Sequence, residues 1–174
     1  MNIAMKKTPK IILISIGGIV GILVIAFGLF LLVHVQGKAE SFEVNTPDAK
    51  HKILIATQGS SFKEDLLQSL IEEIQNDSLY VKVIDVGDLG NIQPSSWDGI
   101  ILIHTVERFN MQKDVAQYLK VTPNLSNVIL ITTSGSGEWE TDEFEVDVIT
   151  SASKKIEIPN IISRIKEKFY FLND

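Results

Sequence analysis

The stretch Lys52-Ile-Leu-Ile-Ala-Thr-Gln-Gly-Ser-Ser61 joins a short apolar run, a polar loop with one glycine, and the start of an amphipathic segment. The run 52–56 predicts a buried strand. Apolar residues then recur at helical spacing up to Ile74, and Ser61 with Glu64 has the spacing of a capping box at the helix start. A strand, a polar loop and a helix therefore follow one another directly.

The same alternation continues to the end of the chain. Further strands are predicted at 80–86, 99–104, 127–132 and 144–150, with helices along 111–119 and 158–169. Buried strands that alternate with helices indicate a parallel sheet covered on both faces. We expect an α/β domain over residues 51–174, doubly wound and five-stranded, with strand order 2-1-3-4-5. Two of its connections are short, so some helices should be shortened or missing.

Charge and composition exclude several classes of function. Residues 1–36 hold three of the 16 basic residues and none of the 22 acidic ones, so the remainder carries a net charge of −9. An acidic domain argues against a nucleic-acid partner, whose phosphates require Lys and Arg. The chain has no cysteine, and its three histidines are far apart in sequence. Disulfides, thiolate metal sites and cysteine nucleophiles are excluded, and we predict no metal site and no catalytic residues.

The N-terminal segment contains an uncharged run of 23 residues, Ile11–Val33. As a helix it would be about 35 Å long, enough to cross a hydrocarbon core of about 30 Å. The alternative, a cleaved signal peptide, would have a shorter apolar region. We therefore predict a transmembrane helix at 11–35 and the lipid bilayer as a partner. Gly17-x-x-x-Gly21 would let two such helices pack as a dimer.

Flanking charges predict the orientation of this helix. Lys6, Lys7 and Lys10 precede it, and positive residues stay in the cytoplasm. The prediction is a single-pass protein of the cell membrane, with a cytoplasmic N-terminus at 1–10 and an extracytoplasmic domain. Residues 36–50 are polar and predict a tether between the two.

Polar residues follow the first predicted strand at the sheet edge where doubly wound proteins bind ligands. Hydroxyl groups, Gly59 and the helix N-terminus together form an anion site that suits one phosphate monoester. An ordinary capped helix after a turn explains the same residues, and the local sequence alone favours it.

Three segments of the chain resemble flavodoxins and flavodoxin-like quinone and porphyrinogen dehydrogenases. They are the loop Ala56–Ser61, the strand Trp97-Asp-Gly-Ile-Ile-Leu-Ile103, and Asn127–Gly137. The first loop of that family has the pattern [T/S]-x-T-G-x-T and surrounds the phosphate of FMN. This chain keeps Gly59 and Ser61, but Ala56 and Gln58 replace two of the hydroxyl residues. The resemblance implies a flavodoxin-like fold and FMN as cofactor.

The resemblance also assigns positions around FMN. Phe109 or Trp139 would stack on the flavin ring, although a helix staple and a surface aromatic are their ordinary alternatives. The residues placed around FMN are Thr57, Gln58, Gly59, Ser60 and Ser61 in the first loop, Thr105 and Phe109 after the third strand, and Thr133, Ser134, Gly135, Gly137 and Trp139 after the fourth. We interpret His104, at the end of the third strand, as a core histidine rather than a proton donor.

The stretch Asp147-Val-Ile-Thr-Ser-Ala-Ser153 resembles the motif by which extracytoplasmic FMN-binding proteins attach a covalent flavin. Similar sequences also recur where flavodoxin-like domains leave their fifth strand, as a small-residue loop before the last helix. We favour the loop, so FMN should be held non-covalently rather than on Ser153.

Together these features predict a membrane-anchored flavodoxin-like protein that binds FMN for electron transfer, with redox proteins or a quinone as partners. Whether it is an FMN-dependent oxidoreductase or only an electron carrier stays open. The alternative is a degenerate flavodoxin-like domain without cofactor that acts as a membrane-tethered interaction module. A phosphoacceptor receiver domain would need an aspartate where His104 stands, and a low-molecular-weight phosphatase would need a cysteine.

Overall fold

The computed structural model describes residues 17–28 and 37–173. The chain divides into two units, residues 1–36 and residues 37–174, and the second is the α/β domain. Its strands are β1 (Phe42–Val44), β2 (His51–Thr57), β3 (Leu79–Asp85), β4 (Gly99–Thr105), β5 (Val128–Thr133) and β6 (Asp147–Ser151). Its helices are α2 (Ser61–Ile74), α3 (Lys113–Val121) and α4 (Ile158–Lys168), with the 3-10 helices η1 (Val86–Asn91), η2 (Pro94–Ser96), η3 (Lys155–Glu157) and η4 (Tyr170–Asn173).

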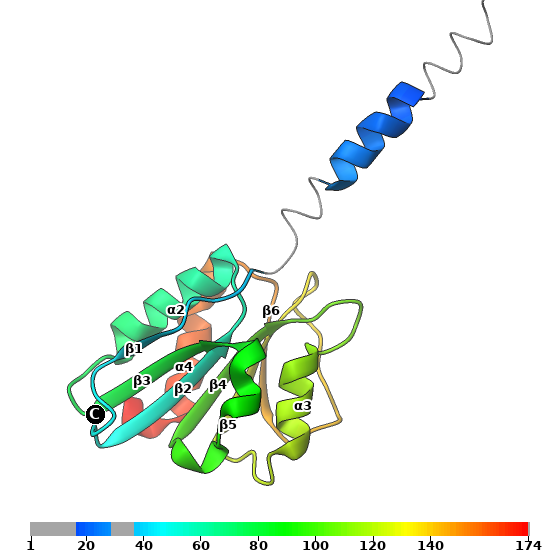
Figure 1. Ribbon diagram of the computed structural model, residues 1–174. Coiled ribbons are helices and arrows are strands. Elements are labelled where there is room, and N and C mark those ends of the chain that lie inside the picture. Colours follow the sequence, from blue (N-terminus) through cyan, green and yellow to red (C-terminus); the bar gives the residue numbers. More distant parts are fainter. Residues whose placement is uncertain (1–16, 29–36, 174) are drawn as a thin grey trace, which may run out of the picture. The chain divides into compact units, whose positions relative to one another are not determined.

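The strands form one six-stranded sheet with the order β1-β3-β2-β4-β5-β6. From β3 to β6 every neighbouring pair is parallel, and β1 joins the edge of β3 as an antiparallel strand. Helices lie on both faces of this sheet (Figure 1). The carboxyl ends of β2, β4 and β5 therefore meet at one edge of the domain.

Side chains alternate between the two faces of each strand and so form two cores. On β2, Ile53 and Ile55 pack with α2 and α4 in one cluster, whereas Leu54 and Ala56 pack with η1 and α3 in the other. All four are fully buried. Because both faces are covered, the strands consist of nearly continuous apolar runs.

The predicted fold class is wrong in its sheet. We expected five parallel strands in the order 2-1-3-4-5, but the sheet has six strands and β1 makes it mixed. The sixth strand comes from residues 37–50, which we expected to form a tether. Phe42, Glu43 and Val44 pair with Val83, Lys82 and Val81, and Lys82 also forms an ion pair of 2.9 Å with Glu43. A three-residue strand is too short for its alternation to stand out in a polar segment.

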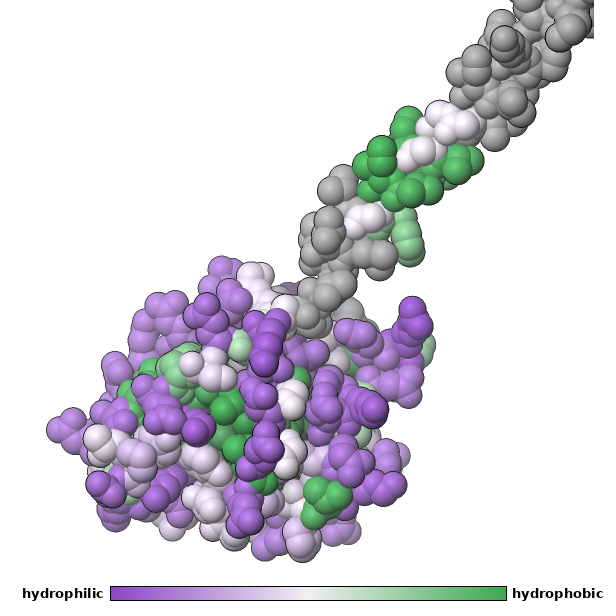
Figure 2. Space-filling model, in the orientation of Figure 1, coloured by the Kyte–Doolittle hydropathy of each residue, from purple (hydrophilic) through white to green (hydrophobic). Residues whose placement is uncertain are grey.

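The predicted membrane helix is also corrected. In the part of the chain that the structure describes, no helix is long and apolar enough to cross a membrane. Residues 17–28 are helical and carry hydrophobic side chains on their surface (Figure 2). The rest of the predicted span, 11–16 and 29–35, lies outside the described residues, as do 1–10 with their lysines. The prediction of a single-pass location in the cell membrane is corrected with it.

Candidate functional site

Three threonines end the central strands at the carboxyl edge of the sheet. Thr57 ends β2, Thr105 ends β4 and Thr133 ends β5. Thr105 and Thr133 are register partners, and their hydroxyl oxygens are 3.0 Å apart. Thr57 and Thr133 are 2% exposed. The structure thus brings these three predicted site residues to one edge, but two of them are buried beneath the surface.

A buried lysine, which the sequence analysis missed, lies beside these threonines. Lys63 is on the first turns of α2, is 1% exposed, and its Nζ donates to Thr105 Oγ1 at 2.6 Å. Burial lowers the pKa of Lys63 to about 8, against the opposing effect of the negative charge of Glu107. The sequence held a signal for this residue, since Lys63 shares a helical face with Leu67, Leu70 and Ile74.

Gln58 closes over the end of β4. Its Oε1 accepts a hydrogen bond of 2.7 Å from the backbone N–H of Thr105. The same loop ends at Ser60, whose side chain caps α2 by accepting the N–H of Lys63 at 3.4 Å. The cap is thus one residue before the Ser61 that the sequence suggested. The side chains of Gln58 and Ser60, both predicted to face FMN, thus accept hydrogen bonds from backbone N–H groups of the domain itself.

The segment 37–44, which we call the strap, closes the same loop from outside. Gly59 N–H donates to the carbonyl oxygen of Gly37 at 2.7 Å, and Gly37 N–H donates to that of Gly59 at 2.9 Å. The strap continues through Ala39, whose N–H donates to Asp85 Oδ2 at 2.8 Å, and then forms β1. The amide of Gly59, a predicted phosphate ligand, is therefore already paired.

The space over Gly59 does not fit a phosphate group. An atom at the Cβ position of Gly59 would lie 2.9 Å from the carbonyl oxygen of Gly37 and 3.0 Å from that of Lys38. Carbonyl oxygens carry partial negative charge and repel phosphate oxygens. At Gly59, the loop that the resemblance assigns to the phosphate of FMN therefore faces two carbonyl oxygens whose partial negative charge disfavours a phosphate.

A cavity of about 730 Å³ lies between the strap and α2. Phe42, Leu67 and Ile71 contribute apolar walls, and Gln58 and Gly59 lie at its lining. Thr57 also lines this cavity, so the cavity adjoins the predicted phosphate loop, whereas Phe109 and Trp139 do not line it.

Four of the residues predicted around FMN, Phe109, Ser134, Gly135 and Trp139, line a second hollow, whereas Thr105, Thr133 and Gly137 do not. This hollow of about 640 Å³ lies between the loop after β4 and the loop after β5, and we call it the carboxyl-edge hollow. Its lining residues are Val106, Arg108, Phe109, Ser134, Gly135, Ser136, Glu138, Trp139 and Glu140. Trp139 Nε1 donates to the carbonyl oxygen of Phe109 at 3.2 Å, so the two loops are joined directly.

Phe109 projects from a tight turn. Glu107 and Asn110 exchange two backbone hydrogen bonds of 3.1 and 2.9 Å, with Arg108 and Phe109 between them. Arg108 has a φ of 50° and Phe109 a φ of 65°. The left-handed region costs a non-glycine residue roughly 1–2 kcal/mol, and this turn places two such residues in succession. The result is a phenylalanine side chain that is 89% exposed.

Close contacts and hydrogen bonds hold the loop after β5 in place. Gly137 has a φ of 73°, and a Cβ there would lie 2.7 Å from the backbone nitrogen of Ala152. Ser134 Oγ accepts the N–H of Gly137 at 2.9 Å, and Thr132 Oγ1 donates to the carbonyl oxygen of Trp139 at 3.3 Å. Only glycine combines this backbone conformation with this close approach. The loop therefore presents Trp139 in a defined position.

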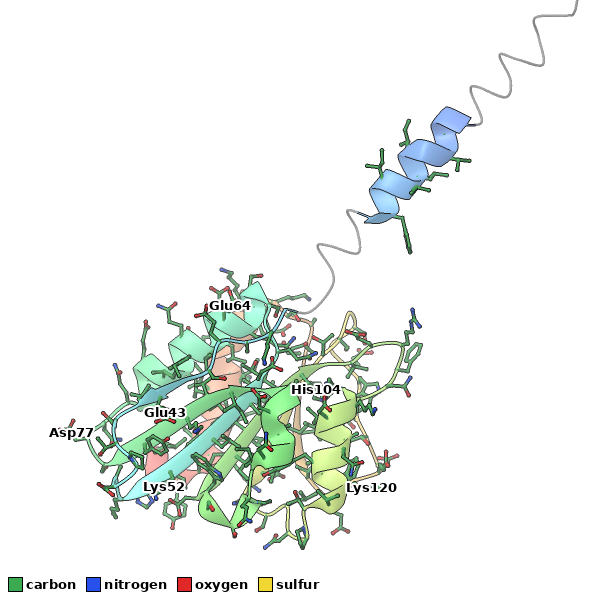
Figure 3. All side chains as sticks on the ribbon, viewed as in Figure 1. Glu43, Lys52, Glu64, Asp77, His104 and Lys120 are labelled. Atoms are coloured by element: carbon green, nitrogen blue, oxygen red, sulfur yellow. The ribbon has the colours of Figure 1, made fainter. Side chains whose placement is uncertain are left out.

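His104 lies behind the loop, at the carboxyl end of β4 (Figure 3). It is fully buried, and its ring meets that of Trp139 edge to face at 6.3 Å. Its Nδ1 is 3.1 Å from the carbonyl oxygen of Thr105, whereas Nε2 has no hydrogen-bond partner among the described residues. Burial lowers the pKa of His104 to about 4, so the ring is neutral at pH 7 and Nδ1 donates to Thr105.

Ser153 lies in the loop that leaves β6. Glu157 Oε2 accepts hydrogen bonds from Ser151 Oγ at 2.5 Å and from the N–H of Ala152 at 3.0 Å. Ser153 has a φ of 60°, and its N–H donates to Ser151 Oγ at 3.0 Å. Glu157 thus fixes these small residues before α4. Over residues 17–28 and 37–173 the structure contains no group of three or more acidic or histidine side chains that could hold a metal ion.

No known protein family matches this chain, and neither does any curated protein. Two solved structures show weak similarity. An oxidoreductase from Corynebacterium diphtheriae is 12% identical, with a TM-score of 0.46, over 71% of this chain and 97% of that one. The Smu.1420 protein from Streptococcus mutans is 11% identical, with a TM-score of 0.43, over 71% and 100%. Both similarities are too weak to assign a function.

Proposed function

We propose that this domain is an interaction module that binds another protein through the carboxyl-edge hollow. The observation that carries the proposal is Phe109, a large apolar side chain that is 89% exposed on a turn of two left-handed non-glycine residues. Strained backbone persists where the surrounding structure imposes it, and it clusters at binding sites. Aromatic residues, Phe included, are enriched at protein interfaces relative to the rest of the surface.

The first loop supports a protein partner over a phosphate-bearing cofactor. Its glycine amide is paired with Gly37, its glutamine with Thr105, and its cap serine with Lys63. These three groups are satisfied by the domain itself and need no ligand for their own stability. The carboxyl-edge hollow, by contrast, is open.

Replacing Phe109 with serine should weaken partner binding at least about tenfold, because an aromatic anchor contributes on the order of 2 kcal/mol or more at such interfaces. The ligands are peptides selected from a random displayed library for binding to the full chain. Fluorescence anisotropy then measures the affinity of each peptide for the wild-type chain and the variant. Val121→Ser is the matched control, since Val121 is an exposed apolar residue at the end of α3. Selected peptides that bind the Phe109 variant as tightly as the wild-type chain would contradict the proposal.

A second candidate is an FMN-dependent electron carrier. The observation that favours it is that the carboxyl-edge hollow lies between the two loops that the flavodoxin resemblance places around the flavin ring, with Phe109 and Trp139 at its lining. These rings could stack on a bound flavin. FMN, when bound, would supply the redox chemistry. Its phosphate would reach the first loop only after residues 37–38 had left Gly59.

Titration with FMN and with riboflavin separates the two candidates. Because the first loop does not fit a phosphate, we expect no saturable quenching of FMN fluorescence at micromolar full-length protein. Riboflavin, which lacks the phosphate, is the matched ligand and should behave in the same way. FMN binding that is at least tenfold tighter than riboflavin binding would show that the loop does hold the phosphate, and the electron-carrier candidate would replace the interaction module.

A further inference from the structure

We infer that the partner of the carboxyl-edge hollow is a segment rich in lysine and arginine, and this inference rests on the function proposed above. Exposed residues of the loop that forms one wall of the hollow carry negative charge. Between residues 138 and 145 the loop contains no Lys or Arg, and its acidic residues, all exposed, are Glu138, Glu140, Asp142, Glu143 and Glu145. Most side chains on the viewed face of the domain are hydrophilic (Figure 2).

Within residues 17–28 and 37–173 none of these five carboxylates forms a salt bridge, whereas several others on the domain pair with its own lysines. Asp147, just beyond the loop, forms an ion pair with Lys168, and Glu73 pairs with Lys166 at 2.9 Å. Residues 37–174 carry a net charge of −9, so the field of the whole domain adds to that of the loop. A surface with one dominant sign of charge attracts a partner of the opposite sign and repels acidic ones.

The loop presents its charges in a fixed arrangement. Thr132 Oγ1 anchors it to β5 by donating to the carbonyl oxygen of Trp139 at 3.3 Å. Within the loop, the N–H of Glu143 donates to Thr141 Oγ1 at 3.2 Å. Phe144 and Val146 pack against the core beneath α3. An ordered surface loses less conformational entropy on binding than a flexible one, which favours a specific docking site.

Aromatic rings next to carboxylates are suited to cationic side chains. Phe109 and Trp139 line the hollow together with Glu138 and Glu140. A lysine or arginine over an aromatic face is attracted by the ring, and a nearby carboxylate increases the attraction. Arg108, on the opposite wall, repels cations. The basic residues of the partner should therefore lie along 138–145, with an apolar side chain directed toward Phe109.

The experiment uses the full chain and a labelled peptide, acetyl-Lys-Arg-Lys-Leu-Lys-Arg-Lys-amide, with fluorescence anisotropy at about 0.15 M salt. The test variant is Glu138→Gln/Glu140→Gln/Glu143→Gln. The matched control is Glu64→Gln/Glu72→Gln/Glu167→Gln, which removes the same charge from exposed positions on α2 and α4. We expect the test variant to bind at least about tenfold more weakly than wild type, and the control to change less than about threefold, because distant exposed charges are largely screened.

Equal weakening by the two triple variants would overturn the inference, because only net charge would then matter. Failure of the wild-type chain to bind the basic peptide would overturn it as well. Binding of the displayed-library peptides shows which of the two proposals has failed. If those peptides depend on Phe109 but are not basic and do not respond to the test variant, the interaction module stands and the basic partner fails. If they depend on neither, both proposals fail.

Discussion

Replacing Gly59 with alanine should lower the free energy of unfolding by about 2–4 kcal/mol and release the strap from the domain. The new Cβ would lie 2.9 Å from the carbonyl carbon and oxygen of Gly37 and 3.0 Å from the carbonyl oxygen of Lys38. All three are backbone atoms, so no flexible side chain can move to make room. The segment must shift, and the two hydrogen bonds between Gly37 and Gly59 are lost with it.

Urea unfolding of the full chain measures the change in stability, and limited digestion with trypsin at Lys38 measures release of the strap. Gly90→Ala is the matched control, because a Cβ at Gly90 in η1 has no atom within 4 Å. We expect the control to stay within about 0.5 kcal/mol of wild type. A Gly59 variant with wild-type stability and a protected Lys38 would mean that the strap does not depend on this contact.

The domain should lose about 3 kcal/mol of stability as the pH falls from 7 to 4, through His104 alone. The pKa of His104 falls from its usual 6.5 to about 4 because the ring is buried, with the charge of Lys63 as a smaller cause in the same direction. The unfolded chain therefore binds a proton below pH 6.5, while the folded domain binds it only near pH 4. Stability is complete above the unfolded pKa and declines as the pH falls toward the folded one.

Two measurements isolate this histidine from the many carboxylates that also titrate. Proton NMR of the full chain should place the titration of the His104 ring below pH 5. Urea unfolding of His104→Leu at several pH values should show a shallower decline than wild type between pH 6.5 and 5, where a gap of about 2 kcal/mol develops. A wild-type ring that titrates near pH 6.5 would contradict the buried, neutral state.

Hydrophobic periodicity in the sequence was sufficient to locate the parallel strands and the three helices of the domain. Long apolar runs and apolar helical faces arise because those residues are buried in the fold. It missed β1, because three residues in a polar segment carry too little pattern and their pairing depends on the distant β3. The predicted membrane helix rested on apolar length alone. In the part of the chain that the structure describes, no helix is long and apolar enough to span a membrane.

The positions of the predicted residues in the sheet could be anticipated from the sequence, but their contacts could not. Strand order places Thr57, Thr105 and Thr133 at one edge, and the loops that follow them contain Phe109 and Trp139. Which hydrogen bonds those residues make depends on side chains from elsewhere in the chain, such as Lys63, and on the strap. A lysine is usually assumed to be exposed, so its place on the apolar face of α2 was overlooked.

The strap also affects how the protein behaves at high concentration. β1 covers the backbone of Val81–Val83, in the middle of the outermost parallel strand. An uncovered strand edge is a template for pairing with another molecule, and that pairing is a route to aggregation. A shortened chain that began after Val44 would expose the backbone groups of β3 to its neighbours in solution. We therefore expect the solubility of the isolated domain to depend on the eight residues of the strap, in which Val44 packs at the edge of one core.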